Sequence, residues 1–365
     1  MRRLSCADKV RNLNRSKYRL NELKKQFRRR RKAAVARRIA IKESLKMPVK
    51  RLIAPRVFGL HDPQKREDLL RFIHKLQEAS QSYQRIQLDF SATELMVSDG
   101  ALYFLANLDS LLISNPSLHI SLKYPENIIV EQVLQQIGII GLIKARKRLV
   151  GGDSFESNVK YWRYATCNRV DASQAQSIFD AMDGLISGAL SKKVFAGVTE
   201  AMTNCTQHAY EDDSREEKLQ KWWMFSQEKD GKLSVLICDL GIGIPASLYK
   251  ANDKVDIGWS NRLISFLEGR DDDGYKIKAA IKIGKSRTKL KNRGKGLNQM
   301  VYELDQYSED QACIKIYSSK GIYQNRYYNK NKILIDKETV SSYKDGIEGT
   351  LVCWSLPLNE LDMTT

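Results

Sequence analysis

The stretch Glu200-Ala-Met-Thr-Asn-Cys-Thr-Gln-His-Ala-Tyr210 carries a polar residue at every fourth position. Glu200, Asn204 and His208 would therefore follow one side of a helix. The residues just before it, 194–198, are mostly apolar, as in a helix that packs into a core. A carboxylate and a carboxamide on a buried helix are costly unless a ligand or a polar network satisfies them. The stretch predicts a ligand site on a core helix, or else a chance polar stripe on an ordinary amphipathic helix.

A second stretch, Leu233–Cys238, is a largely apolar run that predicts a buried strand. It leads into Asp239-Leu-Gly-Ile-Gly-Ile-Pro245. An acid at a strand end can orient a ligand, and Gly241 and Gly243 would let the backbone approach that ligand closely. The pattern predicts a binding site where this strand ends.

Two further stretches are rich in glycine. Asn292-Arg-Gly-Lys-Gly-Leu297 opens an apolar-periodic segment, so its backbone N–H groups and Lys295 could meet phosphate at the start of a helix. Gly349-Thr350 precedes a predicted strand, Leu351–Leu356. Each stretch alone is a weak signal, because glycine pairs are common in turns. Their order and spacing make a strong joint signal.

In this order of motifs, residues roughly 165 to 360 resemble the GHKL ATPase superfamily, which includes gyrase, the ninety-kilodalton class of heat-shock chaperones, histidine kinases and MutL. The resemblance implies an α/β sandwich in which helices cover one face of a mixed sheet. It also implies that ATP lies between a helix and a lid.

The same resemblance implies a role for each motif residue. Asn204 corresponds to the family's Mg²⁺-binding asparagine, and Glu200 to the glutamate that activates water in hydrolysing members. Asp239 would accept a hydrogen bond from the adenine amino group, in a pocket shaped by Gly241 and Gly243. Phosphate contacts are implied for Arg293, Gly294, Lys295 and Gly296, and a place near the adenine for Thr350.

The segment between Gly243 and Gly294 is long for a loop, which predicts a lid over the nucleotide. Within it, 257–267 and 275–283 are predicted helices. Closure of a lid around Mg·ATP would make the site a switch as well as an enzyme. The role of His208 stays open, because that position varies in the family.

Positive charge is concentrated at the N-terminus. Of the net charge of +18, residues 1–50 hold +16, with nineteen Lys and Arg against three acids. The hydrophobic content of 42% is typical of a globular protein. The sequence has no apolar run of the roughly 20 residues that a membrane span needs. It has no signal-peptide pattern either. The six cysteines are scattered without metal-ligand spacing, as expected for reduced thiols of a cytoplasmic protein.

The basic arm is predicted to form a helix from about residue 16 to 45. This helix would be only marginally stable alone, because its apolar stripe is thin. Its densest run of charge is Arg28, Arg29, Arg30, Arg31 and Lys32. Such a run predicts binding to the phosphates of RNA or DNA, because neutralising a nucleic-acid backbone releases counterions. An acidic protein surface, an anionic membrane and a targeting segment remain alternatives.

Predicted strands and helices alternate over residues 51–150, which indicates an α/β unit. The predicted strands are 52–60, 83–89 and 118–122; the predicted helices are 67–78, opened by Pro63, 100–114 and 129–136. Ile86–Ser91, Ser98-Asp-Gly100 and Leu134–Gly138 resemble a STAS domain, the fold of anti-sigma-factor antagonists. The resemblance implies a platform for a protein partner. Where phosphorylatable members carry a serine before the glycine, this chain has Asp99, so a phosphoswitch is in doubt.

These inferences divide the chain into a basic, helical arm (1–50), a STAS-like α/β domain (51–150) and a GHKL-type ATP-binding domain (151–365). The expected function is that of an ATP-binding protein, a slow Mg²⁺-dependent ATPase acting as a nucleotide-controlled switch. One alternative is an anti-sigma-type protein-serine kinase, in which Glu200 deprotonates a partner's hydroxyl. Another is a non-hydrolysing module that binds nucleic acid or protein. An ATP-dependent homodimer is a further expectation from the resemblance.

Overall fold

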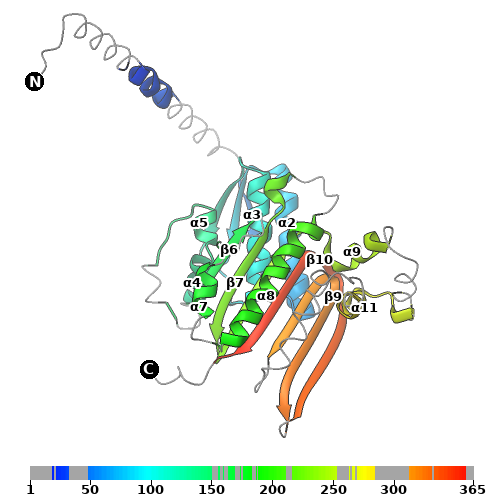
Figure 1. Cartoon of the computed structure of the whole chain (residues 1–365). Coiled ribbons are helices and arrows are strands. Elements are labelled where there is room, and N and C mark those ends of the chain that lie inside the picture. Colours follow the sequence, from blue (N-terminus) through cyan, green and yellow to red (C-terminus); the bar gives the residue numbers. More distant parts are fainter. Residues whose placement is uncertain are drawn as a thin grey trace, which may run out of the picture.

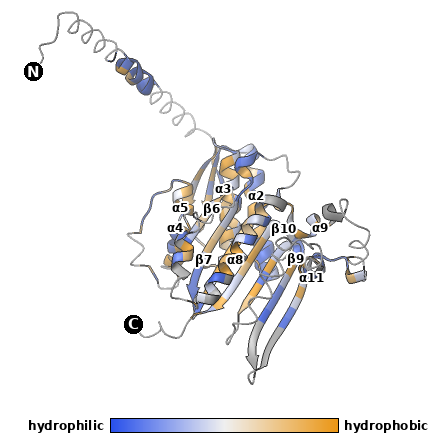
Figure 2. Cartoon of the chain, viewed as in Figure 1, coloured by the Kyte–Doolittle hydropathy of each residue, from blue (hydrophilic) through white to orange (hydrophobic). Residues whose placement is uncertain are grey.

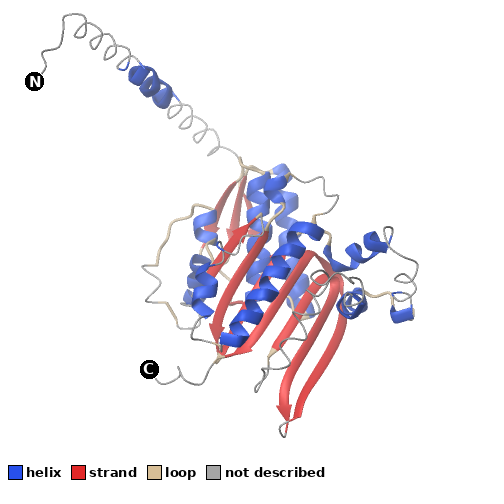
Figure 3. Ribbon diagram, viewed as in Figure 1, coloured by secondary structure: helices blue, strands red, loops and turns tan. Residues whose placement is uncertain are grey.

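The computed structural model describes residues 19, 22–32, 48–149, 155–156, 159, 163–168, 173, 176–182, 186, 188–210, 216–252, 263, 265–267, 269–283, 312–330 and 333–358. The chain has a mixed α/β fold that contains both parallel and antiparallel sheets (Figures 1 and 3). This confirms the α/β class expected from the sequence. Among the described helices, none combines the length and the apolarity that crossing a membrane requires.

The N-terminal unit is built on a parallel sheet in the order β1-β3-β5. Its strands are β1 (Lys50–Ile53), β3 (Arg85–Asp89) and β5 (His119–Lys123), and its helices are α2 (Pro63–Ser82), α3 (Ser98–Ser114), α4 (Ile128–Gln136) and α5 (Ile139–Leu142). The strand predicted at 52–60 is in fact two pieces, β1 and β2 (Val57–Phe58), and β2 pairs with β4 (Leu95–Met96). Pro55 lies between the two pieces and has no N–H for a sheet ladder, which explains the break.

The start of α2 follows a familiar capping pattern. The side chain of Asp62 accepts hydrogen bonds from the backbone N–H groups of Gln64 and Lys65, each at 3.1 Å, and Pro63 occupies the first turn. Both features are favourable at a helix N-terminus. The prediction that Pro63 opens this helix is therefore confirmed.

The second sheet has five strands in the order β6-β7-β8-β10-β9. They are β6 (Arg163–Cys167), β7 (Trp222–Lys229), β8 (Lys232–Asp239), β9 (Cys313–Lys330) and β10 (Ile333–Pro357). Every described pairing in this sheet is antiparallel. The expectation of a mixed sheet is wrong in this respect, because β7 joins β8, and β9 joins β10, as hairpins.

Both faces of this sheet are buried. On one face, side chains of β7 and β8 pack with α8 (Gly188–Asn204); they are Trp222, Met224, Val235 and Ile237. On the other, alternate side chains pack against the N-terminal unit, mainly α3; they are Trp223, Phe225, Leu236 and Cys238. Figure 1 shows α8 in front of the sheet and α2 and α3 behind it. Burial on two faces explains why Leu233–Cys238 is largely apolar without strict alternation. The hydrophobic core behind the sheet also includes residues from both sides of the domain boundary predicted near residue 150.

Polar contacts accompany this shared core. The Asp109 carboxylate of α3 accepts hydrogen bonds from Lys221 Nζ at 2.6 Å and from Trp223 Nε1 at 2.9 Å. The Asp99 carboxylate accepts from the Tyr317 hydroxyl at 3.2 Å and from the Leu60 N–H at 3.2 Å. Asp99 is only 6% exposed. Asp99, which the STAS resemblance aligns with the serine of phosphorylatable members, thus makes contacts inside this fold.

Helix α11 (Asp273–Ile283) lies in the segment predicted to be a lid, yet it is part of the core. Ile277 and Ile281 are both 0% exposed. A Cβ placed on Gly321 of β9 would lie 2.5 Å from the backbone carbon of Asp273, so helix and strand are in backbone contact. The lid prediction is wrong for this helix. It is also wrong for 243–252, which form the helix α9 (Gly243–Asn252) packed against β9 and β10; residues 284–294 lie outside the described part.

A half-buried carboxylate ties α11 to β10. Glu338 accepts hydrogen bonds from Lys278 Nζ at 2.9 Å, from Lys282 Nζ at 2.7 Å and from the Tyr323 hydroxyl at 2.9 Å. Burial alone would raise the pKa of Glu338, but the hydrogen bonds from Lys282, Lys278 and Tyr323 outweigh burial and lower that pKa to about 2. Stability from this carboxylate is therefore complete above the unfolded-state pKa and is lost as pH falls toward the folded-state pKa.

Replacing Glu338 with glutamine should flatten the acid limb of the stability curve. Between its ordinary pKa of 4.5 and about 2, the free energy of unfolding of the wild type should fall more steeply with decreasing pH than that of Glu338→Gln. Urea unfolding at a series of pH values measures both slopes. The double variant K278M/K282M should flatten the same limb, since it removes both lysine donors. Equal slopes for wild type and Glu338→Gln would contradict this account.

Candidate functional site

The site is centred on Asp239, the last residue of β8. Its position along the strand has the parity of Val235 and Ile237, which places its side chain on the α8 face of the sheet. The residue is 5% exposed. Its Oδ1 accepts a hydrogen bond from the Gly241 N–H at 2.8 Å, and Cys205 Sγ lies 3.6 Å from Oδ2, with the thiol as the donor. The strand end and the helix end predicted to form one site are therefore in direct contact.

Cys205 serves as a neutral donor at this contact. Burial raises the pKa of its thiol well above the ordinary value, and the nearby Asp239 carboxylate raises it further. The S–H therefore stays protonated and can donate, although weakly. The sequence reasoning passed over Cys205 because its only visible signal was its place beside Asn204.

The predicted helix changes its winding within the motif. Helix α8 ends at Asn204, and Cys205–Ala209 form a single π-helical turn. The hydroxyls of Thr203 and Thr206 donate to carbonyls one turn earlier, at 2.9 Å to Thr199 and 3.1 Å to Met202, an arrangement that bends helices. Single π turns inside α-helices often occur at functional sites. The uniform spacing predicted for the stripe thus holds from Glu200 to Asn204 but not onward to His208, whose side chain lies outside the described part.

Glu200 and Asn204 are half-buried, which corrects the premise that both project from a fully buried face. Within the described part of the chain, neither side chain has a hydrogen bond or an ion pair with another residue. Their oxygens lie one turn apart on α8, beside the buried Ala201 and Cys205. A carboxylate and an amide oxygen so placed could meet both a ligand and solvent.

The glycines of the site allow close contacts between separate stretches of the protein backbone. A Cβ on Gly241 would lie 2.1 Å from the carbonyl oxygen of Ala209, and one on Gly349 would lie 2.1 Å from the carbonyl oxygen of Asp239. Gly243 has a φ of +79°, which glycine adopts without strain. The absent side chains at 241 and 349 thus let the π turn, the end of β8 and β10 touch through their backbones. At Gly241 protein backbone fills the space that a Cβ would take, and the close approach of Gly241 to a ligand stays a prediction.

A serine on the neighbouring strand organises the opposite wall. Ser318 of β9 donates to the Gly349 carbonyl at 2.9 Å, accepts from the Ile244 N–H at 2.8 Å and lies 3.0 Å from the Thr350 hydroxyl. The antiparallel register pairs Ser318 with Thr350. Thr350 is thereby held next to the start of α9, within the group of contacts around Asp239. Sequence reasoning missed Ser318, because nothing local marks the pairing of these strands.

Tyr210 directly follows the π turn and also belongs to this group of contacts. Its hydroxyl donates to the Lys221 carbonyl at 2.6 Å and accepts from the Leu240 N–H at 3.1 Å. Burial, and then the Asp239 carboxylate, raise the pKa of Tyr210, so it stays a neutral phenol. This residue fixes the backbone immediately after Asp239.

The remaining predicted residues divide into two groups. The phosphate-binding prediction concerns Arg293, Gly294, Lys295 and Gly296, which lie outside the described residues. The basic run Arg28–Lys32 is described: it belongs to helical residues 22–32, and all five side chains are exposed and strongly hydrophilic (Figure 2). In the same helix Leu23 and Phe27 are 55% and 69% exposed.

The five described cysteines, Cys167, Cys205, Cys238, Cys313 and Cys353, are free thiols. Within the described ranges, no three side chains of His, Cys, Asp and Glu gather as a set of metal ligands. In comparisons with known proteins, no protein-family model matched the chain, and no curated protein matched it. The GHKL and STAS-like resemblances therefore stay predictions that rest on the residues quoted for them.

Proposed function

We propose that this chain is a cytoplasmic ATP-binding protein, a slow Mg²⁺-dependent ATPase whose nucleotide state controls how its N-terminal parts engage a partner. The observation that carries the proposal is the contact between Cys205 and Asp239. It joins the Glu200–Asn204 stripe to the acid and glycines after β8, while Gly349 brings in Thr350 from a third distant stretch. Residues from three separate motifs thus surround one strand end.

The hydrogen-bond acceptors of Asp239 fit the amino group of adenine. A carboxylate has about four acceptor positions, and Asp239 presents such a carboxylate beside the Gly241 N–H and the Cys205 thiol at the end of β8. The adenine amino group is a donor for such a carboxylate. The neighbouring Thr350 hydroxyl could take part in the same contacts, since Ser318 holds it in place. Buried hydrogen bonds of this kind give specificity for one base edge.

The side-chain oxygens of Glu200 and Asn204 on α8 are suited to Mg²⁺-dependent hydrolysis. Carboxylate and amide oxygens suit Mg²⁺, so Asn204 would ligate the ion. When bound, Mg²⁺ would neutralise charge that develops on the phosphates. Glu200, half-buried one turn earlier, would orient the attacking water and take its proton as general base. The resemblance assigns the phosphates to Arg293, Gly294, Lys295 and Gly296.

The arm extends the proposal to a polyanionic partner. Exposed cations at Arg28–Lys32 favour phosphate contacts with RNA or DNA. Binding of this kind weakens steeply with salt and shows little sequence preference. Replacing all five residues with glutamine should weaken RNA and DNA binding and reduce its salt dependence, since fewer cations then meet phosphate, without changing ATP binding.

Two substitutions test the nucleotide site. Asp239→Ala should weaken ATP binding by about 10- to 100-fold, the value of a hydrogen bond to a charged group. Glu200→Gln should keep ATP binding but slow phosphate release by about 100-fold or more, as expected for loss of a general base. Calorimetric titration with ATP and Mg²⁺ and a phosphate-release assay measure the two effects. Glu217→Gln, at an exposed carboxylate in a separate turn, is the matched control and should change neither.

The outcomes also separate the alternatives. Transfer of labelled phosphate to a serine of a partner protein would replace the hydrolase by a protein-serine kinase. Tight ATP binding without phosphate release would leave a non-hydrolysing module. If the wild type binds no ATP, or if Asp239→Ala binds it as tightly as the wild type does, the proposed site is refuted.

A further inference from the structure

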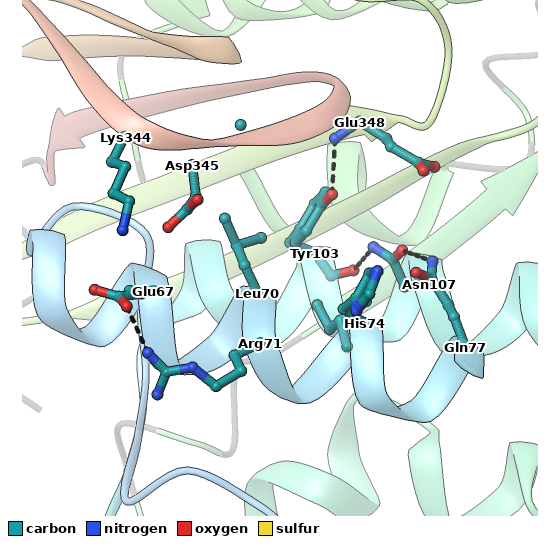
Figure 4. Close-up of a pocket in the computed structure, with 12 residues that line it drawn as sticks. Glu67, Leu70, Arg71, His74, Gln77, Tyr103, Asn107, Lys344, Asp345 and Glu348 are labelled. Atoms are coloured by element: carbon teal, nitrogen blue, oxygen red, sulfur yellow. Dashed lines mark hydrogen bonds and ion pairs between the residues drawn. The ribbon is translucent and has the colours of Figure 1, made fainter. Parts of the chain in front are cut away.

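A pocket separate from Asp239 lies where the two units meet. It has a volume of about 430 Å³, is open to solvent, and is lined by residues of α2, α3 and 344–348 of β10 (Figure 4). Cavities of this size commonly hold small molecules. None of the residues predicted for the nucleotide site lines it.

The floor of the pocket is apolar and well ordered by packing. Leu70 is half-buried, and Ile73 and Tyr103 are 4% and 2% exposed. At one end two amides are linked, since Gln77 Nε2 donates to Asn107 Oδ1 at 3.4 Å and Asn107 Nδ2 donates to the Tyr103 carbonyl at 2.9 Å. Such a floor would accept an aliphatic or aromatic group of limited size.

The opposite wall is held rigidly against the helices. Arg66, 1% exposed, donates to the backbone carbonyls of Asp345 at 3.1 Å and Ser319 at 3.0 Å. Its guanidinium also lies over the ring of Tyr343, 4.4 Å from the centroid. The Glu348 N–H donates to the Tyr103 hydroxyl at 2.9 Å. The wall is thus preformed, which lowers the ordering cost of binding a ligand.

An irregularity in β10 directs two opposite charges into this pocket. The pairing of β10 with β9 shifts register between Ser342 and Ile347. Bulges of this kind re-aim side chains that would otherwise alternate between faces. Lys344 and Asp345, although adjacent in sequence, therefore both extend toward α2 (Figure 4). Neither side chain has an ion pair or a hydrogen bond within the described part of the chain.

Across the pocket, the two charged residues of α2 that line it, Glu67 and Arg71, are already paired with each other. Arg71 forms ion pairs with Glu67 and, at 3.1 Å, with Asp68. On the opposite wall, the carboxylate of Glu348 extends away from Lys344 and Asp345 (Figure 4). The ammonium of Lys344 and the carboxylate of Asp345 are therefore the pair of adjacent opposite charges that this wall offers a ligand. One cation beside one anion matches a molecule that carries both signs on neighbouring atoms, and it disfavours a polyanion or a polycation.

We propose that this pocket binds a small zwitterion of the free α-amino acid class, with an apolar side chain. The ligand's ammonium group pairs with Asp345 and its carboxylate with Lys344. Its side chain rests on Leu70, Ile73 and Tyr103. The proposal is independent of nucleotide binding, because the two sites share no residue.

Isothermal titration of the full chain with the standard amino acids tests the proposal, leucine being the reference. For the wild type, binding should be lost or weakened about tenfold or more when leucine is replaced by 4-methylpentanoate, which lacks the amine, or by isoamylamine, which lacks the carboxylate. Asp345→Asn and Lys344→Met should each weaken leucine binding to a similar degree. Lys337→Met, at an exposed lysine on the same strand, is the matched control and should bind leucine as the wild type does.

Several results would overturn the proposal. One is the absence of binding of any apolar amino acid at millimolar concentration. Another is equal affinity for leucine and isoamylamine, which would make the site one for simple cations. A third is unchanged leucine binding in both Asp345→Asn and Lys344→Met. The analogue series needs only the wild type, so it decides the question even if a variant fails to fold.

Discussion

Replacing Gly349 with alanine should lower the free energy of unfolding by about 2 to 5 kcal/mol and abolish the proposed binding of ATP. Gly349 has a φ of +73°, and its added Cβ would lie 2.1 Å from the carbonyl oxygen of Asp239 and 2.7 Å from its Oδ1. The left-handed conformation costs an alanine about 1–2 kcal/mol, and overpacking a tight site costs about 1–3 kcal/mol. Because the clash is with backbone, relief requires β8 and β10 to separate where Asp239 must be held.

Gly231 offers a matched control for the conformational part of that cost. It has a φ of +70°, but a Cβ there would meet nothing within 4 Å. Gly231→Ala should therefore lose only about 1–2 kcal/mol and should bind ATP like the wild type. Urea unfolding and ATP titration of both variants measure the difference. Equal stability losses for the two variants would show that the contact between Gly349 and Asp239 is looser than this packing implies.

Local signals were enough to predict most of the framework around the site. The apolar run Leu233–Cys238 became β8, and Asp62 with Pro63 became the capped start of α2. In each case the signal lies within one short stretch. For β8 it is the run of apolar residues, and for α2 it is the pair of residues typical of a helix start. The alternation of strands and helices over 51–150 likewise predicted an α/β unit.

The long β9–β10 ribbon could not be predicted in the same way. Only Leu351–Leu356 was expected as a strand, whereas β10 spans Ile333–Pro357. Much of the added length is polar, as in Asp336–Ser342, and it is extended because it pairs with β9 and lies under α11. Strand formation there depends on partners far away in sequence, and β-propensity gives little information in such cases.

In the site, too, some residues are marked by the local sequence and others depend on contacts with distant parts of the chain. Asp239 and the glycines near it were evident from the sequence, but the reason for Gly241 and Gly349 was not. Those residues are glycines because two distant backbones meet there, and no sequence pattern reports such a meeting. Ser318 becomes a neighbour of Thr350 only through the strand register. Residues that act through long-range pairing are thus the ones that sequence reasoning missed.

Replacing Asp109 with alanine should cost about 3–5 kcal/mol, which is typical when one partner of a buried ion pair is removed. The Asp109 side chain is 11% exposed and that of Lys221 16% exposed. The variant would leave the Lys221 ammonium and the Trp223 N–H without this acceptor, at the face where α3 covers β7. An ammonium group that is mostly removed from water and has lost its carboxylate partner is costly to keep charged. The loss should loosen the N-terminal unit from the second sheet, and urea unfolding together with hydrogen exchange in α3 and β7 would measure it.

A comparison with an exposed pair isolates burial as the cause. Arg56 and Glu94 form an ion pair whose side chains are 74% and 56% exposed, and such pairs contribute about 0–1 kcal/mol. Glu94→Ala should therefore be nearly neutral, whereas Asp109→Ala should not. Asp109→Asn should fall between wild type and Asp109→Ala, because the amide oxygen can still accept from one of the two donors. If Asp109→Ala cost no more than Glu94→Ala, the apolar contacts of α3 alone would hold the two units together, and the buried carboxylate would contribute only to their register.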